Sequence, residues 1–359
     1  MTAAAAPGSP LDPAVVRDTV ETLLRGFLDE REQATLARLP ELALFTGLLR
    51  DFLEAGGKRI RPQLCVAGWQ AITDLPPPPV LWGTAASLEL FHAFCLIHDD
   101  VMDHSDTRRG RPTAHRALAA HHAERSNAED LGINAAILLG DLALGWSYEL
   151  LHTTEDSRRQ LESVWPLLSS MRTDTLVGQY LDLVAAGKPD SDVESAWRIV
   201  RYKTAKYTIE TPLVLGATLA GATREQLRVL SAYAIPLGEA FQLRDDLLGM
   251  YGHPEQTGKP ILDDLREGKR TVLVSTALRC ASAAQKRVLR DRLGNLQVTD
   301  IQAAEVRDLI TATGAPAAIE HLIDAKRRQA LRALTTPTFR PHGNAWLRHF
   351  AHAATTRTL

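Results

Sequence analysis

Residues 91–115 constrain the fold more than any other segment, because an apolar run leads there directly into a cluster of carboxylates. The run ends in Asp99, Asp100 and Asp103. Residues four apart lie on one face of a helix, so Asp99 and Asp103 point the same way if the run is helical. Like charges at this spacing destabilise a helix by roughly 0.2–0.5 kcal/mol per pair, so the cluster needs an explanation. A solvated acidic turn is one explanation, and a metal site is the other.

Two other features favour the metal site. Arg108 and Arg109 follow the acidic cluster, and guanidinium groups suit phosphate oxygens. A second carboxylate pair, Asp245 and Asp246, also emerges from an apolar segment, although Gly249 would allow an ordinary helix end there. Mg²⁺ binds through one or two carboxylates together with substrate phosphates, and facing helices of a bundle are a usual place for a carboxylate site. The two pairs together predict a metal–diphosphate site.

Basic residues gather in four further segments. The first is GGKRIRP at residues 56–62, where glycines let the backbone approach an anion and Lys58 and Arg61 lie three apart. The others are YKTAK at residues 202–206, GKP at residues 258–260 and the charged stretch at residues 263–271. Each alone could be a capped helix end or a solvated loop. Together they hold more cations than one diphosphate needs, which indicates two anionic substrates, one held by metal ions and one by lysine and arginine directly.

Helical periodicity runs through most of the chain. From residue 11 onward, apolar residues recur at three- and four-residue steps, while no sustained period-two run predicts a strand. We expect one large all-α bundle at residues 11–335, a disordered tail at residues 1–10 and a separate C-terminal segment at residues 336–359. Pro166, Pro212 and Pro236 fall inside helical patterns and are expected to kink them. Helix is expected from residue 11 onward and again between Pro62 and the prolines at residues 76–79. The other expected helices lie at about residues 43–53, 81–104, 131–152, 158–186, 192–219, 224–252, 269–281, 283–294, 299–313 and 315–335.

Composition excludes several classes of protein. The net charge of −2 argues against a nucleic-acid partner held by bulk electrostatics. No apolar run reaches about 18 residues, so no membrane span is expected. The N-terminus lacks the basic and apolar regions of a secretory signal, which predicts a cytoplasmic protein. The widely spaced Cys65, Cys95 and Cys280 form no CxxC pair and are expected to be free, buried thiols.

Five motifs in a fixed order make the sequence resemble the (E)-polyprenyl diphosphate synthase family, over residues 56–271. They are GGKRIRP, DDVMDHSDTRRG, GQYLDL at residues 178–183, YKTA, and FQLRDDLLG followed by GKPILDDLREGKRT. The resemblance implies an isoprenoid synthase bundle with a central cavity and a homodimeric prenyltransferase. It would condense isopentenyl diphosphate with dimethylallyl, geranyl or farnesyl diphosphate, through an allylic cation in an apolar pocket.

The resemblance also implies a role for each matching residue. Direct ligands of Mg²⁺, with three ions expected beside the allylic diphosphate, would be Asp99, Asp103 and Asp245. Residues supporting these ligands would be Asp100 and Asp246. Residues holding or adjoining the allylic diphosphate would be Arg108, Lys203, Lys259 and Gln242. Residues holding isopentenyl diphosphate without metal would be Lys58, Arg61, His92 and Arg109. Residues steadying the ionised allylic carbons would be Thr204 and Gln179, and Lys269 would help to close the site.

The residues that would form the floor of the pocket indicate the length of the product. Residues one to two turns before the first aspartate form the floor of the pocket in this family, here Phe94 and Cys95. Their sizes resemble those of medium-chain synthases, so geranylgeranyl diphosphate is the expected product and farnesyl diphosphate the alternative. The second motif usually has a third acid where this chain has Gly249, which puts metal affinity on that side in doubt. A non-catalytic subunit of the same fold and a terpene cyclase are the competing classes.

Overall fold

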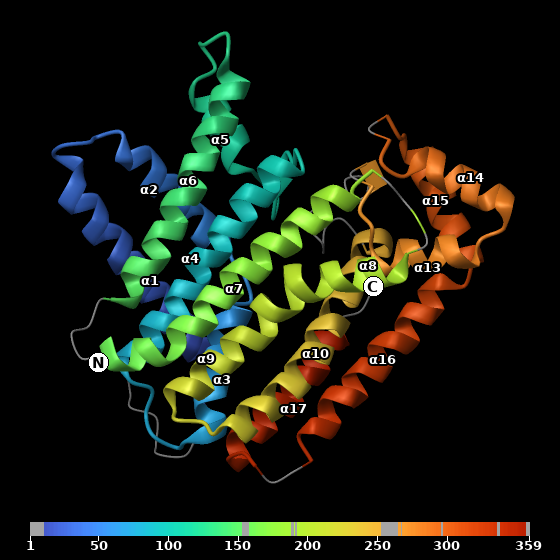
Figure 1. Ribbon diagram of the computed structural model, residues 1–359. Helices are drawn as coiled ribbons and strands as arrows, with labels where there is room; N and C mark the ends of the chain where they lie inside the picture. Colours follow the sequence, from blue (N-terminus) through green and yellow to red (C-terminus); the bar gives the residue numbers. More distant parts are fainter. Residues whose placement is uncertain are drawn as a thin grey trace. The chain divides into compact units, whose positions relative to one another are not determined.

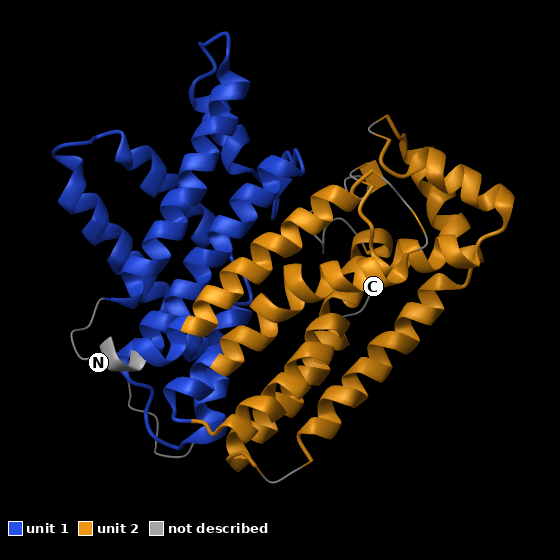
Figure 2. Cartoon of the chain, viewed as in Figure 1, with its two compact units in different colours: residues 1–165, 215–221 blue, residues 166–214, 222–359 orange. Residues whose placement is uncertain are grey.

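The computed structural model describes residues 11–152, 158–187, 190, 192–252, 265–266, 268–295, 297–335 and 338–356 (Figure 1). In these residues the chain is helical except for one short hairpin, so the predicted all-α fold is confirmed. The helices form two compact units, residues 1–165 with 215–221 and residues 166–214 with 222–359 (Figure 2). The tail predicted at residues 1–10 lies outside the described residues, and the domain limits drawn from the sequence remain predictions.

The first unit is built around α4. Its helices are α1 (Pro13–Leu36), α2 (Leu42–Glu54), α3 (Ile60–Ile72), α4 (Pro79–Met102), α5 (Ala114–His121) and α6 (Ala128–Leu151). α4 packs against α1, α2, α3, α5 and α6, which explains why it is apolar on nearly every face. It begins at Pro79, the last of four consecutive prolines, because a proline in the first helical turn loses no hydrogen bond.

α4 and α6 approach closely at a glycine. A Cβ atom on Gly140 would lie 2.3 Å from both Cδ2 and Nε2 of His98, so only glycine leaves room for this imidazole. His98 Nε2 lies 3.0 Å from the carbonyl oxygen of Ile137 and therefore forms a hydrogen bond between the two helices. The last turns of α4, which carry the acidic cluster, are fixed to α6 at this point.

α4 and α6 are also long and apolar enough to cross a membrane by length and composition alone. The most apolar window of α4 is 72% buried within the protein, as in the core helix of a globular domain, while that of α6 is 39% buried. α6 therefore keeps part of its apolar surface exposed, including Ile137 and Leu138.

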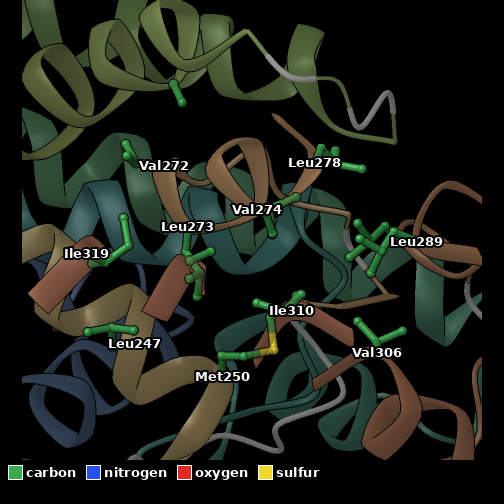
Figure 3. Packing of buried hydrophobic residues seen from close by; sticks show 14 of the residues in the cluster. Leu247, Met250, Val272, Leu273, Val274, Leu278, Leu289, Val306, Ile310 and Ile319 are labelled. Carbon is green, nitrogen blue, oxygen red and sulfur yellow. The ribbon is translucent and has the colours of Figure 1, made fainter. Parts of the chain in front are cut away.

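The second unit contains the remaining helices, except that α7 starts in the first unit and α9 ends in it. They are α7 (Arg158–Ala185), α8 (Val193–Ile199), η2 (Val200–Glu210), α9 (Thr211–Leu219), α10 (Arg224–Tyr251), α13 (Val272–Cys280), α14 (Ala283–Arg292), α15 (Asp300–Ala312), α16 (Ala315–Ala333) and α17 (Pro341–Thr355). α10 packs against η2, α13, α16 and α17. Side chains from α10, α13, α14, α15 and α16 form one continuous buried cluster, part of which Figure 3 shows, including Leu247, Leu273 and Ile310.

One predicted helix contains an unexpected π-helix. The sequence predicts a continuous helix over residues 192–219, and the structure divides it into α8, the π-helix η2 and α9. The N–H of Thr211 donates to the carbonyl oxygen of Lys206, five residues back. Pro212 follows immediately and has no N–H to donate, so it cannot restore the α-helical pattern at this turn. Pro166 and Pro236 lie inside α7 and α10.

The C-terminal helix α17 is part of the second unit. The hydroxyl of Tyr233 on α10 donates to the carbonyl oxygen of Leu347 at 2.7 Å. Arg244, also on α10, donates through Nε to the carbonyl oxygen of Thr355 at 3.1 Å and pairs through both terminal nitrogens with Glu320 at 2.6 Å. Two buried side chains of α10 therefore hold α17 by its main chain.

The three cysteines are free thiols. Cys65 is buried, and burial raises the pKa of its thiol to about 12. Cys95 is partly buried, whereas Cys280 is exposed, which corrects the expectation that all three are buried. Cys280 is the last residue of α13, where the chain reaches the surface before α14.

Candidate active site

The predicted first acidic cluster lies at the C-terminal end of α4. Asp99 is in the last full turn, and Asp103 caps the helix, with its N–H donating to the carbonyl oxygen of Asp99 at 2.8 Å. His104 then adopts a left-handed conformation (φ 53°) and stops the helix. Asp99 and Asp103 are partly buried and four residues apart. The structure thus has the predicted pair of carboxylates at one helix end.

Asp100 points into the protein and pairs with Arg108. Its side chain is 1% exposed, and both of its oxygens accept hydrogen bonds from Arg108, at 2.7 to 2.9 Å. Arg108 Nη2 also lies 3.7 Å from a carboxylate oxygen of Asp99. Burial alone would lower the pKa of Arg108, but the hydrogen bonds and charge of Asp100, with the charges of Asp99 and Asp103, raise it. Asp100 therefore fixes a permanent cation beside the partly buried carboxylates of Asp99 and Asp103.

A short hairpin carries the arginine pair. β1 (Thr107–Arg108) and β2 (Arg111–Pro112) are antiparallel, and both residues of the connecting turn, Arg109 and Gly110, have positive φ angles (53° and 72°). The Arg109 guanidinium donates to the carbonyl oxygen of Gly56. It also lies 3.4 Å from where a Cβ atom on Gly57 would be. The hairpin thus brings Arg109 onto the GGKRIRP loop, two segments that the sequence assigned to one substrate.

His92 lies on α4 and is surrounded by positively charged arginine side chains. It is partly buried, and its pKa is lowered well below the ordinary value, first by burial and then by the charges of Arg61, Arg109, Arg108 and Arg59. Arg59 and Arg61 come from the start of α3, and Arg108 and Arg109 come from the hairpin, so both segments face His92. The structure therefore gathers Arg61, His92 and Arg109, three of the four residues assigned to isopentenyl diphosphate, and Lys58 is exposed just before α3.

Two residues of this region were missed by the sequence reading. Arg59 is 5% exposed and pairs through Nη1 with Glu89, which is 3% exposed, at 2.8 Å. The sequence reading treated Arg59 as one more surface charge of the loop. Glu89 carried a signal, because it is a lone acid within the apolar part of α4, three residues before His92.

The lysine motif lies on the π-helix of the second unit. Lys203 Nζ lies 2.6 Å from Asp182 Oδ2, and Lys206 pairs with Asp174, so two carboxylates of α7 face two lysines of η2. A Cβ atom on Gly178 would lie 2.3 Å from the backbone nitrogen of Lys203. This contact explains why the GQYLDL motif begins with a glycine. Asp182 lies four residues further along the same face of α7, and nothing in the sequence indicated its contact with Lys203.

The second acidic pair lies near the end of α10. Asp245 and Asp246 are partly buried, and Gln242 donates to Asp246 Oδ1 at 2.8 Å. Gly249 lies within the helix, which ends at Tyr251 with Gly252 as its C-cap, so the acidic pair does lie near a helix end, as the alternative reading of this segment requires.

The other predicted site residues are distributed over several elements. Gln179 on α7, Thr204 on η2 and Lys269 before α13 are partly buried. Next to Lys269, Arg270 pairs with Asp190 at 2.7 Å. Lys259 lies outside the described residues.

Phe94, the predicted floor residue, is buried in the first unit. Its ring contacts Phe91, with centroids 5.6 Å apart, and His98, with centroids 4.8 Å apart. Cys95, the other floor residue, is partly buried. The imidazole of His98 packs against Gly140 of α6 and also contacts the ring of Phe94. The position of Phe94 therefore depends on the contact between α4 and α6.

The carboxylates fit Mg²⁺ rather than a closed metal cage. Among the described residues, no three His, Cys, Asp or Glu side chains form a group that could hold a metal by themselves. Mg²⁺ does not need such a group, because it keeps several waters and takes further oxygens from substrate phosphates. The pair Asp99 and Asp103 in one unit and the pair Asp245 and Asp246 in the other are donor sets of this kind.

Comparison with known proteins gives consistent results. A family model described as Polyprenyl synthetase matches residues 43–310. A short chain isoprenyl diphosphate synthase of Methanocaldococcus jannaschii is 33% identical over 73% of this chain and 74% of its own length. A (2E,6E)-farnesyl diphosphate synthase of Mycobacterium tuberculosis is 33% identical over 72% of this chain and 68% of its own. The crystal structure of geranylgeranyl pyrophosphate synthase from Corynebacterium glutamicum, complexed with isoprenyl diphosphate and magnesium, superposes with a TM-score of 0.92 at 38% identity, covering 97% of this chain and 100% of the other.

Proposed function

Because the chain belongs to the polyprenyl synthetase family and is a prenyltransferase, we propose that it condenses isopentenyl diphosphate with an allylic diphosphate in a Mg²⁺-dependent reaction. The family resemblance inferred from the five motifs is confirmed by the family match. The main support for this reaction is the arrangement of charged side chains in the first unit. Asp99 and Asp103 lie at the C-terminal end of α4, and His92, two turns earlier on the same helix, is faced by guanidinium groups from the start of α3 and from the hairpin.

Asp99, Asp103 and Asp245 are the proposed ligands of Mg²⁺, with three ions bound beside the allylic diphosphate. When bound, the ions draw negative charge onto the leaving diphosphate. Arg108 supports the same task as a fixed cation, since Asp100 holds its guanidinium in place. Lys203 is proposed to contact the same diphosphate, and its ammonium is held by Asp182.

Isopentenyl diphosphate is proposed to bind without metal at Lys58, Arg61, His92 and Arg109. Direct contacts from arginine suit a diphosphate, because the planar guanidinium donates two parallel hydrogen bonds. His92 is neutral at physiological pH, since its pKa is lowered well below its ordinary value. It can therefore donate or accept one hydrogen bond without adding charge to an already cationic site.

The carbon chain is proposed to grow toward Phe94, with geranylgeranyl diphosphate as the product and farnesyl diphosphate as the alternative. Thr204 and Gln179 are proposed to steady the allylic cation, and an apolar pocket that excludes water protects it. The burial of Phe94 between Phe91 and His98 supports a rigid floor, because the ring has neighbours on both sides along α4.

A second copy of the chain is the proposed partner, as a homodimer. Apolar side chains remain exposed on α6 and, at helical spacing on one face, on α7, which is unusual for a monomer. They are Ile137 and Leu138 on α6 and Leu176, Val177, Tyr180, Leu183 and Val184 on α7. The free thiols agree with the proposal that the enzyme acts in the reducing cytoplasm.

A product assay tests the proposed function. Purified protein is incubated with Mg²⁺, isopentenyl diphosphate and each of the three allylic starters, and the alcohols are sized after phosphatase treatment. We expect geranylgeraniol, no product after chelation of the metal, and loss of activity in Asp103→Ala. The matched control is Asp106→Ala, which removes an exposed carboxylate that pairs with Arg116 on the outside of the same region. Absence of elongation with every starter would favour a cyclase or a non-catalytic subunit instead.

A further inference from the structure

Arg59 turns its charge into the protein, although it lies between Lys58 and Arg61. Its side chain is 3% exposed, while Lys58 is exposed. A guanidinium can be buried only where it is paired and hydrogen-bonded. Arg59 meets this need with three acceptors: Glu89 Oε2 at 2.8 Å, Glu21 Oε1 at 3.2 Å and the carbonyl oxygen of Leu53.

Glu89 supplies the buried half of this pair from α4. Among the described residues, its second oxygen, Oε1, is buried and has no hydrogen-bond partner. Glu89 is three residues before His92 and therefore lies on the same face of α4, one turn earlier. Its charge acts on Arg109, whose pKa is lowered by burial and by neighbouring arginines but raised by Glu89. The carboxylate is thus a buried counter-charge for the arginines around His92, in addition to Glu21 and Asp100.

The backbone of Arg59 is as unusual as its side chain. Arg59 caps the N-terminus of α3, and its backbone has a left-handed conformation (φ 46°) that residues other than glycine rarely adopt. In the described part of the chain, the other non-glycine residues with positive φ are His104 and Arg109, so all three lie in the loops of this site. Strained residues of this kind persist where the surrounding structure holds them. The contacts of Arg59 with Glu89, Glu21 and Leu53 help to hold this turn, together with a hydrogen bond of 2.6 Å from the side-chain amide of Gln63 to the carbonyl oxygen of Lys58.

We propose that Arg59 and Glu89 form a positioning pair for the diphosphate that binds without metal. Arg59 fastens the N-terminus of α3 to α4, and the left-handed turn that it fixes sets the directions of Lys58, just before the turn, and of Arg61, in the first turn of α3. The pair thereby holds these two cations in register with His92, which Glu89 precedes by one turn on α4. This inference rests on the proposed function, because it assigns the GGKRIRP loop to isopentenyl diphosphate.

The test replaces the pair without leaving a buried charge. Removing one partner of a buried ion pair leaves the other uncompensated, whereas replacing both with apolar residues of similar size is often neutral for stability. The main variant is therefore Arg59→Met with Glu89→Leu, and Arg59→Lys is the second, because it keeps the charge but cannot reach all three acceptors. The matched control is Arg50→Met, which removes an arginine of the same unit that pairs with Asp29 and Glu32 at the surface.

The measurements separate positioning from general stability. We expect the double variant to unfold at the wild-type temperature, with the KM for isopentenyl diphosphate raised about tenfold and the allylic KM and kcat little changed. Arg59→Lys should raise the same KM by less, and Arg50→Met should leave it unchanged. Calorimetric titration with isopentenyl diphosphate in the absence of Mg²⁺ should show the same loss of affinity.

Two outcomes would overturn the proposal. One is an unchanged KM for isopentenyl diphosphate in a folded double variant. The other is a fall in thermal stability that accompanies equal changes in both KM values, which would mean that the pair only supports the fold. Failure of the proposed function is seen separately, as a wild-type protein that elongates no starter. The metal-free titration with inorganic diphosphate would then still compare the variants with the wild type.

Discussion

Replacing Gly178 by alanine should push α7 and the π-helix apart. An added Cβ atom would lie 2.3 Å from the backbone nitrogen of Lys203 and 2.6 Å from the carbonyl carbon of Tyr202. Backbone atoms cannot swing away as the end of a flexible side chain can. The two helices would have to separate by about 1 Å to reach an ordinary contact distance. Lys203 would move with its helix, away from Asp182 on α7.

The magnitude follows from a comparison with Gly47. An alanine in a helix interior gains about 0.5–1 kcal/mol over glycine, and this gain applies at both positions. A Cβ atom on Gly47, in α2, would have no neighbour within 4 Å, so Gly47→Ala should stabilise the protein by that amount. Gly178→Ala should add an overpacking cost of about 1–3 kcal/mol. Because the helix gain is shared, the difference between the variants measures the contact with Lys203.

Urea unfolding followed by circular dichroism, together with the KM for the allylic starter, measures both consequences. We expect Gly178→Ala to have the lower midpoint and a raised allylic KM, because the ammonium of Lys203 is displaced. Gly47→Ala should have a raised midpoint and unchanged kinetics. If Gly178→Ala proved as stable as Gly47→Ala and bound the starter normally, α7 and η2 could not be in the close contact described above.

Three other changes have predictable results. Phe94→Ala should lengthen the product by opening the floor of the pocket, and an unchanged set of alcohols in the product assay would show that Phe94 is not the floor. Gly140→Ala should alter the product distribution as well, because the added methyl group must displace His98 and with it Phe94; normal products from this variant would disconnect the α6 contact from product length. His92→Gln should weaken the dependence of stability on pH. A histidine whose folded pKa is lowered binds fewer protons when folded than when unfolded, so its contribution to stability is present above its ordinary pKa and is lost as pH falls below about 6.5. Unfolding midpoints measured from about pH 7.5 to 5.5 should therefore fall less in the variant, and equal slopes would contradict the cause given for the shift.

Local sequence signals were sufficient for most helices and for the acidic clusters. The apolar period and the four-proline loop placed α4 within two residues at each end, since both signals act within a single helix. The same holds for Asp99 and Asp103, whose relation depends only on helical spacing. The hairpin at Arg109 and Gly110 was missed because its strands have two residues each, too few for a periodic pattern.

Other features depend on residues far apart in the sequence and left no local signal. Arg59 looks like Lys58 and Arg61 until Glu89, thirty residues later, is placed beside it. Asp182 acquires a function only because Lys203 faces it from another helix. The spacing of apolar residues in η2 also did not distinguish a π-helix from an α-helix, because the difference lies in which carbonyl each N–H finds.

The way in which α10 holds the C-terminal helix has a consequence for how that part of the chain can vary. Tyr233 and Arg244 bind the carbonyl oxygens of Leu347 and Thr355, and every amino acid offers the same carbonyl. A substitution at Leu347 or Thr355 therefore leaves the hydrogen-bond acceptor itself unchanged. A deletion that shifts the helix by one residue would move both acceptors. These two hydrogen bonds therefore constrain the length of α17, whereas packing constrains its buried side chains, such as Leu347 and Phe350. Arg244, which makes one of the two contacts, is next to Asp245, so α10 connects the C-terminal helix to the second acidic pair.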